Sequence, residues 1–181
     1  MSDLALASIA ELARAFEQGS TTPDAAMRAV LDRIEQHESR LGAFQVVYAE
    51  EAMQAAEAST RLLRSGHRVG PFHGIPFALK DIVDLAGRVT TGGSAAMRDR
   101  VPEHSAAIAR NLIAAGGVLI GKTRTVEVAM GGWGTNRRMG TPVNPWDLRT
   151  HRAPGGSSSG SGVAVAAGMA HCAVGTDTGG S

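Results

Sequence analysis

Two segments rich in glycine and serine enclose a short apolar stretch, and their spacing constrains the fold more than any other feature of this sequence. The first covers residues 155–162 and the second covers residues 175–181. Taken alone, the first segment is also typical of a flexible linker. It leads, however, directly into the apolar residues 163–167, which are typical of a buried element. We therefore predict a helix of small residues over 159–169, followed by a strand that begins at 172–174.

The lengths of this helix and strand permit the two glycine-rich segments to meet at one end of a sheet. A helix of about ten residues extends roughly 15 Å, and a strand of five or six residues returns roughly 17–20 Å. Ser157 before the helix and Ser181 after the strand can therefore lie at the same edge. Lys80 follows the apolar residues 75–79, so it ends a predicted strand. Open α/β sheets place their sites at this edge, although an isolated lysine at a strand end is more often a surface residue.

The rest of the chain alternates between helical and strand patterns. Ser8 and Glu11 form a capping box before the first helix, and Pro23 is expected at the first position of the second. Helices are predicted over residues 8–18, from 22 through 34, and over 50–63, 105–115 and 125–130, and strands over 44–48, 74–80 and 118–120. This alternation indicates an α/β layered fold with a mixed, largely parallel central sheet flanked by helices.

The composition excludes several classes of function. The net charge is +1 and the basic residues are scattered, so neither a nucleic acid nor a membrane is an expected partner. The single cysteine, Cys172, cannot form an internal disulfide, which favours a cytoplasmic location. Cys172 itself is interpreted as a small core residue. Residues 1–15 lack a basic signal-peptide start, and no apolar run is long enough to span a bilayer. The histidines lack zinc-ligand spacing, so no metal is expected.

Two other interpretations of the glycines fit less well. Neither the Walker pattern nor the G-x-G-x-x-G pattern of nucleotide-binding loops occurs in the chain. Ser158 lies two residues from both Gly156 and Gly160, as in a nucleophile elbow. That motif requires a strand leading into the serine, and the sequence predicts none there.

Several motifs, taken in their order along the chain, resemble those of amidase-signature enzymes. They read GIPFALKD at 74–81, GKT at 121–123, NPWD at 144–147, PGGSSSGS at 154–161 and GTDTGGS at 175–181. Ser157 and Ser181 are 24 positions apart, which is the spacing of that family. The resemblance extends from about residue 70 onward. It implies the N-terminal part of one amidase-signature domain, with a helical N-terminal region over 1–66 and a catalytic core segment over 67–181.

The resemblance also implies a role for each motif residue. Ser181 would be the nucleophile, Ser157 a bridging serine after a cis peptide bond with Gly156, and Lys80 the base. The oxyanion hole would be formed by the backbone N–H groups of Thr178, Gly179, Gly180 and Ser181, and the substrate pocket would include Gly131, Gly132 and Trp133. Trp133 is equally well interpreted as a packing residue, and Asp177 is better interpreted as a structural turn residue than as a buried orienting carboxylate.

This chemistry requires these residue types. A serine hydroxyl becomes a strong nucleophile only when a base removes its proton. Lys80 can be that base only when it is neutral, so burial must lower its pKa. Ser157 can relay the proton because a hydroxyl both donates and accepts, and Ser–Lys pairs are a known variant of the serine triad. The implied activity is hydrolysis of linear amides through an acyl-enzyme, without a cofactor.

The chain also departs from the family pattern. Family members are much longer and continue with an Ile-Arg pair after the nucleophile, so we expect this chain alone to be inactive or nearly so. One alternative is the glutamine-hydrolysing subunit of a tRNA-dependent amidotransferase, whose loop usually carries Ser or Thr where this chain has GGWG at 131–134. Another is a non-catalytic fragment. The expected partner is a small-molecule amide, with a homodimer or a complementary C-terminal chain left open.

Overall fold

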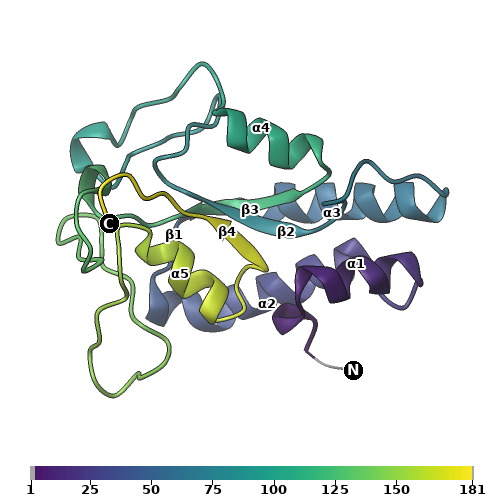
Figure 1. The fold of residues 1–181 in the computed structure, drawn as a ribbon, viewed down its shortest axis with the longest axis horizontal. Helices are drawn as coiled ribbons and strands as arrows, with labels where there is room; N and C mark the ends of the chain where they lie inside the picture. The colour runs from purple at the N-terminus through teal and green to yellow at the C-terminus, as the bar shows by residue number, and fades with distance from the viewer. Residues whose placement is uncertain (1–2, 181) are drawn as a thin grey trace.

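The computed structural model describes residues 3–180 as a four-stranded sheet with helices on both faces (Figure 1). The strands are β1 (Phe44–Val47), β2 (Pro76–Lys80), β3 (Val118–Thr123) and β4 (Cys172–Val174), in the spatial order β1-β3-β2-β4. β2 is parallel to both β3 and β4, whereas β1 is antiparallel to β3. The predicted α/β fold with a mixed, largely parallel sheet is therefore confirmed.

The helices divide between the two faces of this sheet. On one face lie α2 (Pro23–Leu41), α3 (Ala49–Arg64) and α5 (Ser159–Ala166), which share one apolar core with Ala78 of β2. On the other face lies α4 (Ala107–Ala114), which packs with Phe77 and Leu79 (Figure 1). Successive strand residues point to opposite faces, so Lys80 shares the face of Ala78, toward α5. All five residues of β2 are buried.

Two predicted helix starts are also confirmed. Helix α1 (Ile9–Glu17) begins with the Ser8–Glu11 capping box, in which each residue bonds the other's backbone N–H group. Pro23 occupies the first turn of α2, and Gly42, with φ of 58°, ends that helix in the left-handed region. Short 3₁₀ turns at η1 (Leu4–Leu6) and η2 (Ala95–Met97) complete the regular structure outside the site.

Several predicted elements differ from the structure; helix α2, for example, continues past residue 34 to Leu41. The helix predicted over 125–130 is only a 3₁₀ turn, η3 (Glu127–Ala129), because Val128 and Ala129 have φ of 49° and 57°, which an α-helix does not accommodate. Helix α5 ends at Ala166 instead of 169, since Gly168 turns the chain with φ of 68°. Strand β3 extends past residue 120 to Thr123, because its later residues pair with the end of β2.

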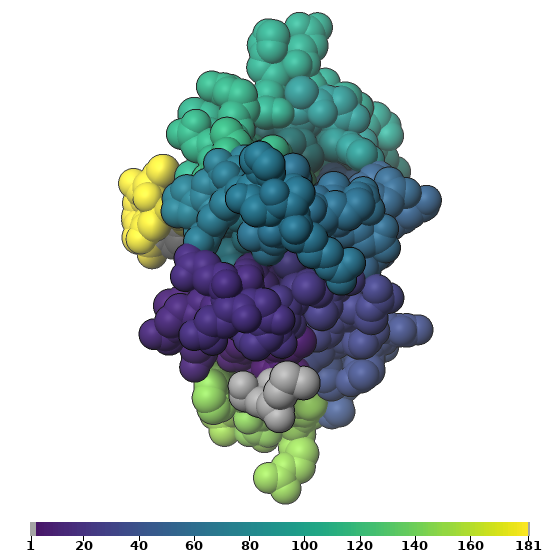
Figure 2. All heavy atoms as spheres, turned by 90° about the vertical axis from the view of Figure 1, so that its right-hand side faces the viewer, coloured from purple at the N-terminus to yellow at the C-terminus, as the bar shows by residue number. Residues whose placement is uncertain are grey.

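The last strand lies at the edge of the sheet and is only half-buried. Cys172 in this strand is therefore a partly buried neighbour of the core under α4, not a fully enclosed residue. Figure 2 shows the C-terminal segment (yellow) at one side of the molecule. Within residues 3–180, none of the helices combines the length and the apolar character needed to cross a bilayer.

Two glycines of helix α5 allow a matched test of this packing. A Cβ atom on Gly160 would lie 2.2 Å from the carbonyl oxygen of Ala43 and 2.5 Å from the backbone nitrogen of Arg124, whereas a Cβ atom on Gly162 would meet nothing within 4 Å. We expect Gly160→Ala to lower the free energy of unfolding by about 1–3 kcal/mol because rigid backbone must move. Gly162→Ala should raise it by up to about 1 kcal/mol through helix propensity. Urea unfolding measures both, and equal effects would contradict this account.

Candidate active site

The centre of the candidate site is a contact between the end of β2 and the start of α5. The Nζ atom of Lys80 donates a hydrogen bond to the Oγ atom of Ser157 at 2.6 Å, although 77 residues separate them in sequence. Both residues are buried, with 0% and 1% of their surfaces exposed. Two of the three predicted catalytic residues are therefore in direct contact. Ser181 lies outside the described residues.

Thr176 provides a second contact to the lysine. Its Oγ1 atom accepts a hydrogen bond from Lys80 Nζ at 2.8 Å, and its carbonyl oxygen lies 3.4 Å from the same nitrogen. The backbone N–H group of Thr176 in turn donates to Ser158 Oγ at 3.1 Å. These bonds join the two glycine-rich segments to each other and to β2. The predicted meeting of both segments and Lys80 at one sheet edge is thus confirmed for the described residues.

The surroundings of Lys80 lower the pKa of its ammonium group. Burial is the main cause, because the charged form loses its hydration inside the protein. The carboxylate of Asp177 acts in the opposite direction through its negative charge. The side-chain partners of Lys80 Nζ among the described residues are the uncharged hydroxyl groups of Ser157 and Thr176. Because neither of them stabilises the ammonium form with a negative charge, the neutral amine is more favoured than in an ordinary lysine.

The backbone around Ser157 is held by several specific contacts. The Gly156–Ser157 peptide bond is cis, as the resemblance implies. The carbonyl oxygen of Ser157 accepts hydrogen bonds from the backbone N–H group of Val126 at 3.1 Å and from Thr125 Oγ1 at 3.0 Å. These bonds fix the serine relative to the segment that follows β3.

The predicted pocket residues Gly131, Gly132 and Trp133 lie in a loop against the same backbone. A Cβ atom on Gly156 would lie 2.5 Å from the carbonyl oxygen of Gly131, and one on Gly134 would lie 2.2 Å from that of Gly155. Only glycine permits this approach. Trp133 is 78% exposed, so its side chain does not pack into the core formed by the described residues. Its role in substrate binding stays a prediction.

In the predicted oxyanion segment, one backbone N–H group has a hydrogen-bond partner within the same turn. The N–H group of Gly180 donates to Asp177 Oδ1 at 2.7 Å, so in this structure it is occupied by an internal bond. Asp177 is thereby a turn residue, in agreement with its structural interpretation, and it is exposed. The roles of Thr178, Gly179 and Gly180 as oxyanion donors stay predictions.

The structure adds residues that the sequence analysis did not identify. Thr125 contacts Ser157 directly and lies outside the recognised motifs; Thr176 contacts Lys80 directly and lies within the motif at 175–181, although the motif gives it no role. The available signal was the position of Thr176 just past a strand, beside the recognised glycines. Within residues 3–180, no group of three or more His, Cys, Asp or Glu side chains is placed to hold a metal ion.

The fold and the buried Ser–Lys contact define a class of α/β proteins with a serine-based site at a sheet edge. Comparison with known families identifies the class, because the family model "Amidase" matches residues 25–181. The chain therefore belongs to the amidase family, and the resemblance seen in its motifs is confirmed.

Two curated relatives illustrate the similarity. The chain is 42% identical over 181 residues to a glutamyl-tRNA(Gln) amidotransferase subunit from Acidothermus cellulolyticus, and the match covers 100% of the chain and 35% of that protein. It is 44% identical over 179 residues to "Putative amidase AmiB2" of Mycobacterium tuberculosis, and this match covers 99% of the chain and 38% of that protein. The chain thus spans little more than a third of the length of these relatives.

Solved structures agree. A crystal structure of an amidase superimposes with a TM-score of 0.87 at 38% identity, over 96% of this chain and 39% of that one. The native peptide amidase of Stenotrophomonas maltophilia superimposes with a TM-score of 0.81 at 34% identity, and the match covers 90% of this chain and 34% of that one. Fatty acid amide hydrolase superimposes with a TM-score of 0.91 at 26% identity, and the match covers 100% of this chain and 32% of that one.

The lowered pKa of Lys80 predicts a change in how stability depends on pH. Between the folded-state pKa and the ordinary value of 10.5, the unfolded chain binds a proton that the folded chain has released. The free energy of unfolding therefore rises with pH in this window, by at most about 1.4 kcal/mol per pH unit for one group. Lys80→Met should remove this contribution.

Urea unfolding of both proteins at a series of alkaline pH values checks this. Other shifted groups, such as Cys172, whose thiol pKa burial raises to about 11, titrate alike in both proteins and cancel in the difference. If the two proteins have the same slope, Lys80 does not have a lowered pKa.

Proposed function

We propose that this chain carries the serine–lysine part of an amide-bond hydrolase. The observation that carries the proposal is the 2.6 Å hydrogen bond between Lys80 Nζ and Ser157 Oγ, made where both residues are buried. Burial lowers the pKa of the Lys80 ammonium group, so Lys80 releases its proton more readily than an ordinary lysine and can then act as a base. Membership of the amidase family gives the reaction class.

The catalytic cycle follows from these roles. Ser181 Oγ attacks the amide carbonyl carbon as its proton passes to Ser157, while the proton of Ser157 passes to the neutral Lys80. The N–H groups at 178–181 stabilise the negative charge on the carbonyl oxygen. The relay then returns a proton to the leaving nitrogen, and the C–N bond breaks. Water attacks the acyl-enzyme and releases the acid, without a metal or cofactor.

We propose linear amides as substrates and the exposed side chain of Trp133, in the loop whose glycines pack on the backbone of Gly155 and Gly156, as part of their binding site. The cytoplasm is the proposed location because the chain carries one cysteine and cannot form an internal disulfide. A small-molecule amide is the proposed ligand. A complementary polypeptide or a second copy of the chain is the proposed protein partner, since the chain covers only 35% and 38% of the two relatives.

A second candidate is glutamine hydrolysis within a tRNA-dependent amidotransferase. The 42% identity to an amidotransferase subunit favours it. The GGWG loop at 131–134, where that subunit usually carries Ser or Thr, favours the amidase instead. Release of ammonia from glutamine only with an added partner subunit would select the amidotransferase.

A fluorophosphonate probe tests the relay without requiring a complete substrate pocket. We expect one adduct, on Ser181, located by peptide mapping and followed by intact mass. Lys80→Met and Ser157→Ala should each slow its formation by about 100-fold or more, because the nucleophile loses its base. Multiple turnover by the 181-residue chain alone is expected to be absent or very slow.

Ser159→Ala is the matched control. Ser159 is as buried as Ser157, and its Oγ atom has no hydrogen-bond partner among the described residues. Its removal should therefore leave labelling unchanged. An adduct on another serine, or one whose rate does not depend on Lys80, would refute the proposed relay, and no adduct at all would show that residues 1–181 do not activate the nucleophile.

A further inference from the structure

Lys80 and Lys122 are the only lysines in the chain, and both are completely buried. They lie on neighbouring strands, because Lys80 pairs in register with Thr123, the residue after Lys122. A buried ammonium group is costly unless a partner compensates its charge. Both ammonium groups therefore need compensation within one pair of strands, and the two lysines have different partners.

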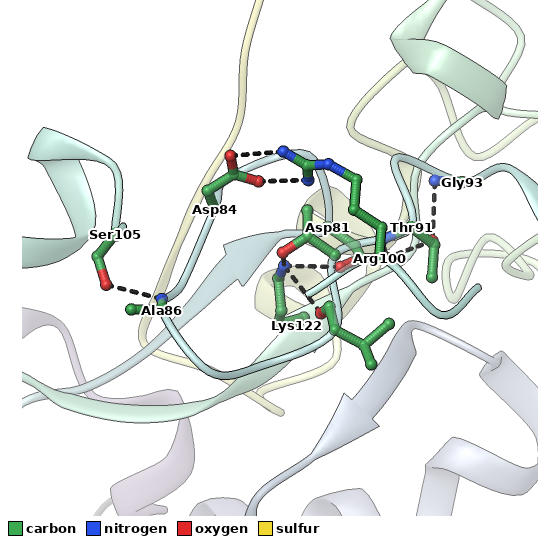
Figure 3. Close-up of polar contacts among 10 residues, drawn as sticks. Asp81, Asp84, Ala86, Thr91, Gly93, Arg100, Ser105 and Lys122 are labelled. Carbon is green, nitrogen blue, oxygen red and sulfur yellow. Dashed lines mark hydrogen bonds and ion pairs between the residues drawn. The ribbon is translucent and has the colours of Figure 1, made fainter. Parts of the chain in front are cut away.

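The two side chains point to opposite faces of the sheet. Thr123 faces α5, since its Oγ1 atom lies 2.7 Å from Ser161 Oγ, and Lys80 faces the same way toward Ser157. Because side chains alternate along a strand, Lys122 faces away from α5. Asp81 directly follows Lys80 in the sequence and forms an ion pair with Lys122. The distance between Lys122 Nζ and Asp81 Oδ1 is 2.8 Å (Figure 3).

This ion pair is enclosed by a defined set of hydrogen bonds. Asp81 Oδ2 accepts from the N–H group and the hydroxyl group of Thr91, at 3.1 and 2.5 Å. Lys122 Nζ donates to Thr90 Oγ1 at 2.5 Å. Among the described residues, no hydrogen-bond donor other than the Lys122 ammonium group is placed to compensate Asp81 Oδ1. Loss of Lys122 would thus leave a buried carboxylate uncompensated, beside the base.

A continuous series of hydrogen bonds connects this ion pair to the relay serine. Thr91 Oγ1 accepts from the N–H group of Gly93 at 3.0 Å, and the carbonyl oxygen of Gly93 accepts from Asn136 Nδ2 at 2.7 Å. Asn136 Nδ2 also donates to the carbonyl oxygen of Thr125 at 3.1 Å. Thr125 Oγ1 in turn donates to the carbonyl oxygen of Ser157 at 3.0 Å.

We propose that Asp81 and Lys122 are a positioning pair that holds Lys80 and Ser157 in contact and keeps the Asp81 carboxylate away from the base. This inference rests on the proposed function of Lys80. One end of the pair is the residue bonded covalently to Lys80, and the other end lies on β3, which leads directly into the segment that binds Ser157. The pair itself does not touch the reacting atoms.

The charges around the two lysines agree with separate roles. Asp177 is the charged group that acts on Lys80, and it does so through space. Lys122 faces Asp81, Asp84 and Arg100. Burial lowers the pKa of both ammonium groups, but only Lys122 has a bonded carboxylate that opposes the effect of burial. Lys122 therefore resembles a structural cation, and Lys80 resembles a base.

The titration of Lys80 can be observed directly in the 181-residue chain. Protein labelled with ¹³C and ¹⁵N at lysine gives two side-chain signals, and Lys122→Met assigns them by removing one. We expect the Lys80 pKa of the wild-type protein to lie below 10.5. In Lys122→Met it should rise by about one unit or more, since the freed carboxylate favours the charged form and the loosened contact admits water.

Charge compensation should reverse this change. Asp81→Asn added to Lys122→Met removes the uncompensated charge while the amide oxygen can still accept the bonds from Thr91. The double variant should recover at least half of the shift in the Lys80 pKa. If Lys122→Met does not fold, Asp81→Glu, which keeps the charge but displaces the carboxylate, should raise the Lys80 pKa in the same direction.

Arg100→Met is the matched control. Arg100 forms a two-bond ion pair with Asp84, at 2.7 and 2.8 Å, in the same segment (Figure 3). This pair is partly exposed, so its loss should leave the Lys80 pKa unchanged. A variant that unfolds at lower temperature without any shift of the Lys80 pKa would overturn the positioning role. An ordinary Lys80 pKa in the wild-type protein would instead refute Lys80 as the base.

Discussion

The hydrogen bond between Lys80 and Ser157 depends on the complete burial of strand β2, and the other features of the site follow from that burial. Helix α4 covers one face of the strand and the core shared by α2, α3 and α5 covers the other, so the end of the strand is shielded from solvent. In this setting a lysine loses part of its preference for the charged form. The serine and threonine hydroxyl groups that contact Lys80 can satisfy its nitrogen whether or not it carries the additional proton.

The many glycines of the second half of the chain serve this same arrangement. Gly156, Gly134 and Gly160 each lie where a Cβ atom would come within 2.5 Å of another backbone atom. The glycines allow the loop at 131–134, the start of α5 and the segment after β3 to pack backbone against backbone around Ser157. A serine held in this way depends little on large side chains, which agrees with an aromatic content of 4%.

The two buried lysines show how one sheet can maintain two electrostatic states. Lys122 and Asp81 are mutually compensated and enclosed by Thr90 and Thr91, whereas Lys80 has only neutral hydrogen-bond partners among the described residues. Breaking a buried ion pair is strongly unfavourable, although such a pair often adds little net stability over apolar residues of the same volume. The pair is therefore better explained by the geometry and charge that it imposes on its neighbours than by the stability it contributes.

The sequence alone determined the elements with strong local signals and the family. The Ser8–Glu11 capping box, Pro23 at a helix start and the apolar run into Lys80 each act within a few residues, so their effects can be read from the chain. The glycine-rich segments also predicted the sheet edge at which Lys80 meets Ser157. The division at residue 66 and the role of Ser181 stay predictions. Only the tertiary structure decided the partners of Asp81, Thr125 and Thr176, because these side chains bond residues that are distant in the sequence. It also decided the turn at 127–129, where Val128 has a left-handed backbone conformation that its local sequence does not predict.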